Sequence, residues 1–150
     1  MIPTTMRPLK TLLLVLALAA SALAATTQIS TDKPIINFST STFTPEGHRS
    51  WLLRASQAQP GRNEIEVSEL TLAIFPGKGD NEKVETMILS PIATVLPADS
   101  VVTGKESIRV ISDQFEAAGS DWHYEHKERK ISINRNVRVT FRAELKEILQ

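Results

Sequence analysis

Cysteine is absent from the 150-residue sequence. No disulfide bond can therefore stabilise the fold, and attachment of a lipid to a cysteine, as in bacterial lipoproteins, is excluded. A chain without disulfides has to be held together by hydrogen-bonded secondary structure and by side-chain packing alone.

An excess of positive charge is absent as well. The chain has 17 Lys and Arg residues against 17 Asp and Glu residues, so its formal net charge is zero. Without Arg7 and Lys10, which stand near the N-terminus, 15 basic residues remain against 17 acidic ones. Nucleic acid is excluded as a partner, because binding to the phosphate backbone requires a basic surface.

No apolar run is long enough to cross a membrane. The longest extends from Leu12 to Ala20, whereas a spanning helix needs about 20 apolar residues. Arg7 and Lys10 precede this run and small residues follow it, a pattern typical of a secretory signal cleaved after Ala24. Residues 1–24 are therefore predicted to be a secretory signal peptide. The alternative is a retained membrane anchor.

The remaining chain has the length of one domain. Residues 25–34 are mostly polar and are predicted to be a flexible lead-in, and residues 35–150 are predicted to form the domain. In residues 142–149 the apolar residues have helical spacing, which predicts a short C-terminal helix or a frayed end. The residues on that helical face are Leu145, Ile148 and Leu149.

Motifs of enzymes are missing too. Lys78 lies between two glycines, but Gly79 and Asp80 follow it where a phosphate-binding loop needs Ser or Thr and a helix, so this stretch is predicted to be a turn. No serine stands in a Gly-x-Ser-x-Gly elbow, and His48 is predicted to be a loop residue. The protein is therefore predicted not to be an enzyme and to have no cofactor.

Asp121, His123 and His126 are of the residue types that bind metal ions. In a strand, however, successive side chains alternate between the two faces, so the two histidines, three positions apart, point to opposite sides of the sheet. A metal site is therefore excluded in this interpretation. Other paired carboxylates lie in polar stretches typical of a solvated surface: Glu64 with Glu66, and Asp113 with Glu116.

The sequence does contain many short strand-like segments, separated by Pro, Gly, Asn and Asp. About nine short strands are predicted, with turns roughly every ten residues, and breaks before Pro91, at Gly104 and between Ala118 and Trp122. This spacing predicts an all-β protein, either an antiparallel β-jelly roll or an open sandwich. The segment 50–56, predicted to pair with 35–39, places on one face Trp51, Leu53 and Ala55.

Within residues 65–74 the apolar side chains change from odd to even positions. Val67 precedes the change, and Leu70, Leu72 and Ile74 follow it. Since a slip of one residue turns a strand face inside out, a bulge or a bend is predicted at residues 68–69, as expected in a sheet that curls.

The segments 122–126 and 131–141 are predicted to form a hairpin whose turn is centred on residues 128–129. One face then contains three cross-strand pairs: Trp122 with Arg135, Tyr124 with Ile133, and His126 with Ile131. The same face continues along the second strand through Val137, Val139 and Phe141. The charged Arg135 either stacks on the Trp122 ring or extends its head group into water.

Two stretches carry a resemblance to a known family. One combines Phe-x-x-x-Gly-x-Asp-Trp-x-Tyr over 115–124 with Lys-Ile-x-Ile-x-x-Asn-Val-x-Val-x-Phe over 130–141. The other is Phe43 with Gly47, followed by an apolar strand that contains Trp51, Leu52, Leu53, Ala55 and Ala58. Together they resemble the periplasmic lipopolysaccharide-export LptC/LptA (OstA-like) family.

Members of that family are β-jelly rolls, open at the ends, whose apolar interior takes the acyl chains of lipopolysaccharide. The resemblance implies a non-enzymatic lipid-binding protein that takes part in lipopolysaccharide transport from an inner-membrane ABC transporter to the outer membrane. Its implied partners are that transporter, the lipid A acyl chains, and other Lpt-type jelly-roll proteins that contact it through edge strands. The implied lipid-binding residues lie on the inward stripes: Leu70, Leu72, Ile74, Ile88, Phe115, Trp122, Tyr124, Ile131, Ile133, Val137, Val139 and Phe141.

Several alternatives stay open from the sequence. The LptC-like component usually keeps a membrane anchor, whereas the signal here is predicted to be cleaved as in LptA, so either role fits. The interior is either hollow or packed. Two other functions are an envelope structural or adhesive β-sandwich without a lipid ligand, and a secreted hydrolase that uses Asp121 and a histidine.

Overall fold

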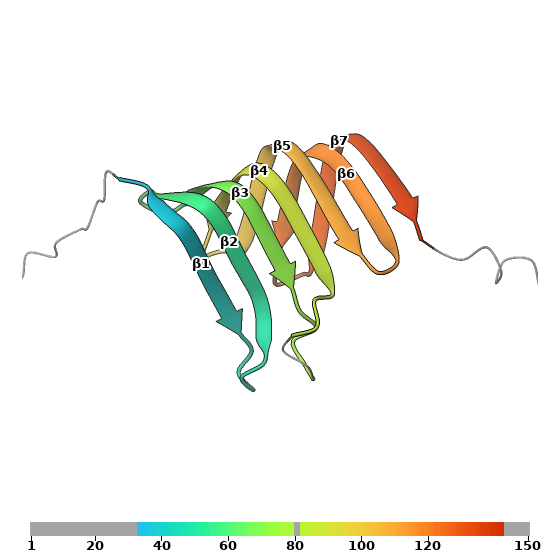
Figure 1. Ribbon diagram of the computed structural model, residues 1–150, viewed down its shortest axis with the longest axis horizontal. Helices are drawn as coiled ribbons and strands as arrows, with labels where there is room; N and C mark the ends of the chain where they lie inside the picture. The colour runs from blue at the N-terminus through green and yellow to red at the C-terminus, as the bar shows by residue number, and fades with distance from the viewer. Residues whose placement is uncertain (1–32, 80–81, 143–150) are drawn as a thin grey trace, which may run out of the picture.

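The computed structural model describes residues 33–79 and 82–142, so the predicted signal peptide, most of the lead-in and the predicted C-terminal helix lie outside the described residues. The described chain forms one sheet of seven antiparallel strands in sequential order (Figure 1). No helix that could span a membrane is found in these two ranges. The predicted all-β, antiparallel class is confirmed. The strands are β1 (Ile35–Phe43), β2 (Arg49–Pro60), β3 (Ile65–Ile74), β4 (Thr86–Leu96), β5 (Val101–Ser112), β6 (Phe115–Glu125) and β7 (Lys130–Phe141).

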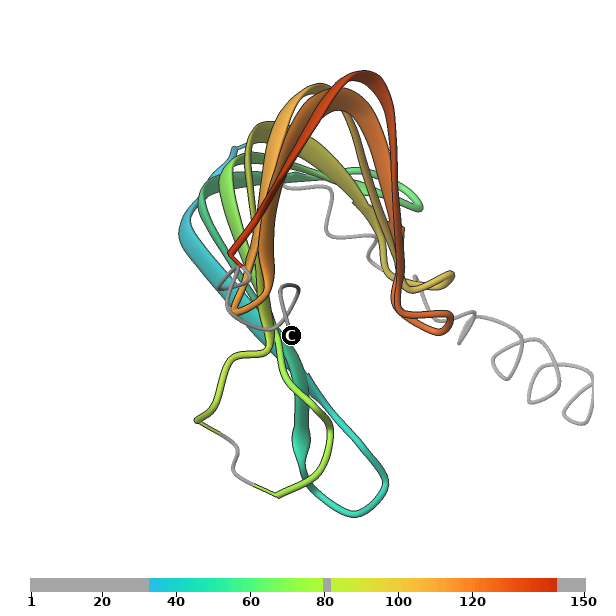
Figure 2. The ribbon, with the colours of Figure 1, turned by 90° about the vertical axis from the view of Figure 1, so that its right-hand side faces the viewer.

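The sheet is bent along its middle into an arch, so that the two halves of the strands face each other across the interior (Figure 2). The bend coincides with residues in the left-handed backbone region, which interrupt the regular alternation of a strand. We call this line the crease. Its left-handed residues, with φ between 51° and 54°, are Asn37 in β1, Glu69 in β3, Asp121 in β6 and Asn136 in β7.

The crease explains the change of phase that the sequence shows in β3. Glu69 has φ 52°, and both Val67 before it and Leu70 after it are buried on the concave face. The bend predicted at residues 68–69 is confirmed. Across the sheet, the pairing of Ser68 with Ile92 and of Leu70 with Ser90 places Pro91 opposite Glu69, so the crease continues into β4.

The strands are longer and fewer than the sequence predicts. Pro91, Gly104 and the segment 118–122 lie inside β4, β5 and β6, where strand ends were predicted. The predicted strand ends were wrong because these residues lie at or next to the crease, where each strand bends but stays in the sheet. The register between β4 and β5 shifts between Leu89 and Thr94, but the strands stay paired on both sides of the shift.

The β6–β7 hairpin exists, but the predicted register is wrong by two residues. Trp122 pairs with Ile133, and Tyr124 pairs with Ile131, because the turn is formed by residues 126–129 and its centre, at 127–128, lies one residue earlier than predicted. A shift of two keeps every side chain on its predicted face. Arg135 lies opposite Ser120, away from Trp122, and is exposed.

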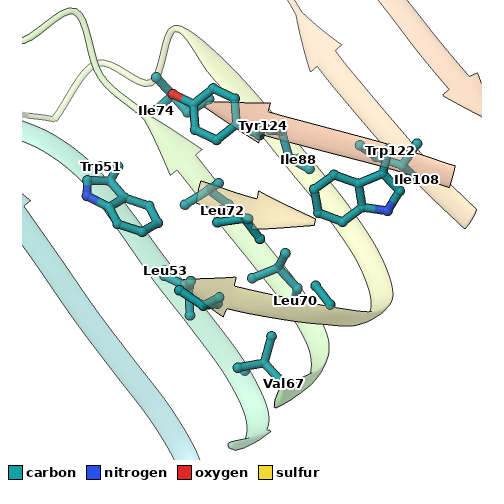
Figure 3. Packing of buried hydrophobic residues seen from close by; sticks show 14 of the residues in the cluster. Trp51, Leu53, Val67, Leu70, Leu72, Ile74, Ile88, Ile108, Trp122 and Tyr124 are labelled. Carbon is teal, nitrogen blue, oxygen red and sulfur yellow. The ribbon is translucent and has the colours of Figure 1, made fainter. Parts of the chain in front are cut away.

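The hydrophobic core fills the space between the two halves of the sheet. Trp51 from β2 and Tyr124 from β6 project into the same interior, together with aliphatic side chains of β3, β4 and β5 (Figure 3). The ten largest side chains with relative exposures below 2% all belong to this core, so this region is close-packed. They are Trp122, Tyr124, Leu53, Leu70, Leu72, Ile88, Ile108, Val67, Val102 and Val110.

Candidate functional site

The residues predicted to bind lipid divide into three groups by exposure. Six are at most 4% exposed and belong to the packed core: Leu70, Leu72, Ile74, Ile88, Trp122 and Tyr124. Phe115, Ile131 and Ile133 are partly buried and pack against that core. Only the last three positions are open to solvent, namely Val137 at 53%, Val139 at 46% and Phe141 at 74% exposed.

The three exposed residues continue the apolar row of the core. Val139 lies opposite the buried Ala117, and Phe141 lies opposite Phe115, so their side chains share the concave face. They are exposed because β7 is the last strand of the described sheet and has a neighbour on one side only. We call Phe115, Val137, Val139 and Phe141 the open end of the concave face.

The opposite edge of the sheet is also apolar. In β1, Ile35 is 42% exposed and lies opposite the buried Ala58, so it belongs to the concave face. Phe38 is partly buried against the core, and Phe43 is 58% exposed. A row of apolar side chains therefore crosses the whole sheet. It is buried in the centre of the sheet and exposed to solvent at both edges.

A polar and aromatic cluster, which the sequence did not predict, lies at the β6–β7 turn. The His126 imidazole contacts the Ser50 hydroxyl through Nε2, at 2.5 Å, and the Tyr124 hydroxyl through Nδ1, at 2.7 Å. The ring also stacks on Trp51, with centroids 5.6 Å apart. Tyr124 and His126, two positions apart, were predicted to share a face, but Ser50 is 76 positions away and no sequence signal connects the two.

Arg129 attaches the same turn to the segment between β3 and β4. Its guanidinium donates a hydrogen bond to the Phe75 carbonyl oxygen at 3.0 Å and forms an ion pair with Glu85. Phe75 in turn lies under the Arg49 guanidinium, 5.3 Å from its ring centroid. Together with the His126 contacts, these interactions join the two facing halves of the sheet through side chains, since β6 and β7 have no backbone pairing with β2 or β3.

Ser50, His126 and Tyr124 are linked in the order hydroxyl, imidazole and orienting group that serine hydrolases use. In such enzymes a carboxylate stabilises the imidazolium that forms during the reaction. Here burial raises the pKa of Tyr124 to about 12, so the third group is a neutral phenol. Burial, and secondarily the positive charge of Arg129, lower the pKa of His126. The cluster therefore disfavours the charged intermediate that nucleophilic catalysis needs.

His123, the other histidine of the predicted metal set, does not share the neighbours of His126. His123 contacts Glu125 at 3.0 Å through its Nε2 atom, whereas His126 lies among Tyr124, Ser50 and Trp51. Asp121 lies at the crease. Within residues 33–79 and 82–142 no three His, Asp or Glu side chains are arranged to hold a metal ion.

The His126 cluster makes stability depend on pH. The pKa of His126 is lowered in the folded protein from its ordinary value of 6.5, so below pH 6.5 the unfolded chain binds a proton that the folded chain excludes. The free energy of unfolding should be highest above pH 6.5 and decrease as the pH falls toward the folded pKa. Urea unfolding followed between pH 7.5 and 5 measures this effect.

The control for this pH dependence is His126→Gln, which removes the titrating group and keeps hydrogen-bonding atoms near Ser50 and Tyr124. Its stability should change little across the same pH window. The pKa of Glu116 is lowered from its ordinary value of 4.5 by a hydrogen bond from Arg109. Its protonation therefore affects stability only below that value, outside the pH window of the experiment. An equally steep loss in both proteins would contradict the assignment to His126.

No model of a protein family matches the chain, and no curated protein matches it.

Proposed function

We propose that the protein is a non-enzymatic lipid-binding protein of the bacterial periplasm that takes part in lipopolysaccharide transport. In this proposal the bent sheet is the wall of a β-jelly roll of the LptC/LptA type, and its concave face takes lipid A acyl chains. The chain receives the lipid on its route from an inner-membrane ABC transporter to the outer membrane. Whether it acts as the LptC-like or the LptA-like component depends on whether residues 1–24 are removed.

One observation carries the proposal: the apolar row of the concave face leaves the core and remains exposed at β7. Soluble proteins rarely expose a contiguous apolar surface without using it for binding. Val137, Val139 and Phe141 expose between 46% and 74% of their surface, side by side on one strand, and Phe115 connects them to the packed centre. An acyl chain lying along this row would extend the core outward.

The packed centre limits where the lipid binds. Trp122, Leu72 and Ile88 are at most 1% exposed, so an acyl chain would have to displace close-packed side chains to reach them. The proposal therefore assigns the acyl chains to the open end of the concave face and treats the six buried residues as core. Of the twelve residues predicted from the sequence, the proposed contacts are those of the open end: Phe115, Val137, Val139 and Phe141.

Photocrosslinking to lipopolysaccharide tests the proposal. A benzophenone side chain placed at Val139 or Phe141 should form adducts with lipopolysaccharide, because both positions lie on the exposed concave face. The matched control is Thr140, between them on the same strand, whose side chain alternates to the convex face. If adducts are absent at both concave positions, or equally frequent at Thr140, the proposal fails.

The alternative function is an envelope structural or adhesive protein without a lipid ligand. In that alternative, the exposed apolar row of β7 is covered by a strand of another protein, and no lipid binds to it. Uptake of a fluorescent fatty acid by the purified protein distinguishes the two, since a purely structural protein should leave the probe in water. The hydrolase alternative is disfavoured by the neutral Tyr124 and the lowered pKa of His126.

A further inference from the structure

Side chains of the β6–β7 turn connect the two halves of the arch on the side away from the crease. Trp51 pairs with Ile74 in one half of the sheet, whereas Tyr124 pairs with Val102 in the other half. Among the described strands, those that are not neighbours in the sheet have no Cα atoms within 8 Å of each other. Away from the crease, the two halves therefore meet through side chains that project into the interior (Figure 3).

The turn is fixed to its own half and makes contacts with the other. The His126 amide donates a hydrogen bond to the Ser100 carbonyl oxygen, at 3.0 Å, which holds the turn beside the β4–β5 turn of the same half. The His126 ring contacts the facing half, where it lies 2.5 Å from the Ser50 hydroxyl and stacks on Trp51. One imidazole therefore forms the first connection between the halves.

Arg129 forms the second connection. It donates a hydrogen bond to the Phe75 carbonyl oxygen and pairs with Glu85, and both belong to the segment between β3 and β4. The Arg129 and Glu85 side chains are 41% and 52% exposed, and ion pairs at such positions contribute little to stability. We call the contacts of His126 and Arg129 with the facing half the clasp. Its loss would leave the backbone pairing of the sheet intact, because that pairing joins neighbouring strands only.

The clasp covers part of the apolar concave face. Trp51 and Tyr124 are 7% and 1% exposed, and the His126 ring lies against both, stacked on Trp51 and edge-on to Tyr124. Ile131 pairs with Tyr124 and is partly buried against the core. Withdrawal of the His126 ring would therefore expose both aromatic rings and the neighbouring Ile131.

The surroundings of His126 favour its neutral form while the clasp is closed. Burial, and secondarily the charge of Arg129, lower the pKa of His126. The Tyr124 phenol that contacts it is neutral, because burial raises the pKa of Tyr124 to about 12, and the Glu85 carboxylate is paired with Arg129. The charged residues of the elements around His126 are Arg49 in β2, Glu85 before β4, Asp99 between β4 and β5, and Glu125, Lys127, Glu128 and Arg129 in its own hairpin.

Protonation is therefore linked to opening of the clasp. In an open state the His126 ring is in water and its pKa returns toward the ordinary value of 6.5, whereas in the closed state the pKa is lower. Below pH 6.5 the open state binds a proton that the closed state excludes, so the equilibrium shifts toward the open state as the pH falls.

We propose that the clasp is a pH-sensitive gate: protonation of His126 releases the turn from the facing half and uncovers a second contact surface for acyl chains, formed by Trp51, Tyr124 and Ile131. The inference rests on the proposed function for its ligand, whereas the opening is a property of the fold alone. It gives Ile131, a predicted lipid contact that is partly buried in the closed state, a state in which it is accessible.

A distance measurement by electron paramagnetic resonance tests the opening. The chain contains no cysteine, so Asp113→Cys/Lys127→Cys allows two spin labels to be attached without further changes. Both positions are exposed and lie just outside the two ends of β6, so their separation reports the angle between the halves. One distance is expected at pH 7.5. Below pH 6.5 a longer distance should gain population, with the ratio of open to closed protein rising by up to about tenfold per pH unit.

Three variants, measured with the same two labels, make the assignment specific. His126→Gln should keep one distance at pH 7.5 and at pH 5, because glutamine retains hydrogen-bonding atoms and does not titrate. Ser50→Ala/Arg129→Gln removes contacts from both connections and should show the longer distance already at pH 7.5. Arg109→Gln is the matched control, since it breaks an ion pair with Glu116 between neighbouring strands of one half, and it should behave like the unsubstituted chain.

Three results would overturn the gate. They are a distance that does not change with pH in the unsubstituted chain, an equal change in His126→Gln, and a longer distance that appears only together with loss of the sheet signal in circular dichroism. The last result would mean that the halves separate by unfolding of the whole domain.

Photocrosslinking distinguishes the gate from the proposed function. A benzophenone side chain at Ile131 should form adducts with lipopolysaccharide at pH 5 and not at pH 7.5, whereas one at Val139 should form them at both. Adducts at Val139 alone reject the second contact surface and keep the proposed function, and equal adducts at Ile131 at both pH values show that the clasp does not control access. If neither position forms adducts, lipid binding is rejected, while the distance measurement still decides whether the clasp opens with pH.

Discussion

Replacing Trp122 with alanine should lower the free energy of unfolding by about 3–5 kcal/mol, the usual cost of removing a buried aromatic side chain from a packed core. Trp122 is 1% exposed and lies between Gly104 of β5 and Ile133 of β7 in the register of the sheet. Its removal would leave a cavity at the centre of the arch. Urea unfolding monitored by circular dichroism measures the loss, which is a large part of the roughly 5–15 kcal/mol by which domains are stable.

The matched control is Phe141→Ala. Phe141 is also aromatic and belongs to the same concave row, but it is 74% exposed, so its truncation should change stability by about 0.5 kcal/mol or less. The contrast tests the division of the row into packed core and open end. A loss at Trp122 as small as that at Phe141 would mean that the centre is a hollow groove, and the lipid-binding surface would then have to be extended to Trp122.

Replacing Gly104 with alanine should cost about 1–3 kcal/mol, because the new methyl group overfills a packed site. A Cβ atom at this position would lie 2.6 Å from Trp122 Nε1 and 3.0 Å from the Ile92 carbonyl oxygen. Neither group can move easily, since the indole ring is buried and the carbonyl belongs to the backbone. The midpoint of thermal unfolding should fall correspondingly.

The cost of Gly104→Ala should depend on Trp122. In a Trp122→Leu background the nearest obstacle is smaller, so the alanine should be better tolerated, with a coupling free energy of about 0.5–3 kcal/mol between the two sites. A double-mutant cycle measured by urea unfolding gives this number. Purely additive losses would show that the contact between the indole and Gly104 does not limit packing.

The sequence determined the fold class and the faces of the strands, because side chains in a strand alternate with a period of two residues. The burial of Trp51, Leu53 and Ala55 on one face and the bend at residues 68–69 follow from this alternation. The β6–β7 hairpin shows why faces are easier to predict than partners. Its predicted register was wrong by two residues, yet Trp122 and Tyr124 are on the predicted face because a shift of two preserves the alternation.

Only the tertiary structure decided which interruptions end a strand and which bend it. Pro91 and Gly104 have the composition of turn residues, but neighbouring strands pair on both sides of them and keep the chain in the sheet. The link from His126 to Ser50 likewise depends on the arch, which brings together segments 76 positions apart. Local patterns contain no information about such distances along the chain. The exposure of Val139 and Phe141 has the same origin, since an apolar strand is core or open surface according to whether another strand lies beside it.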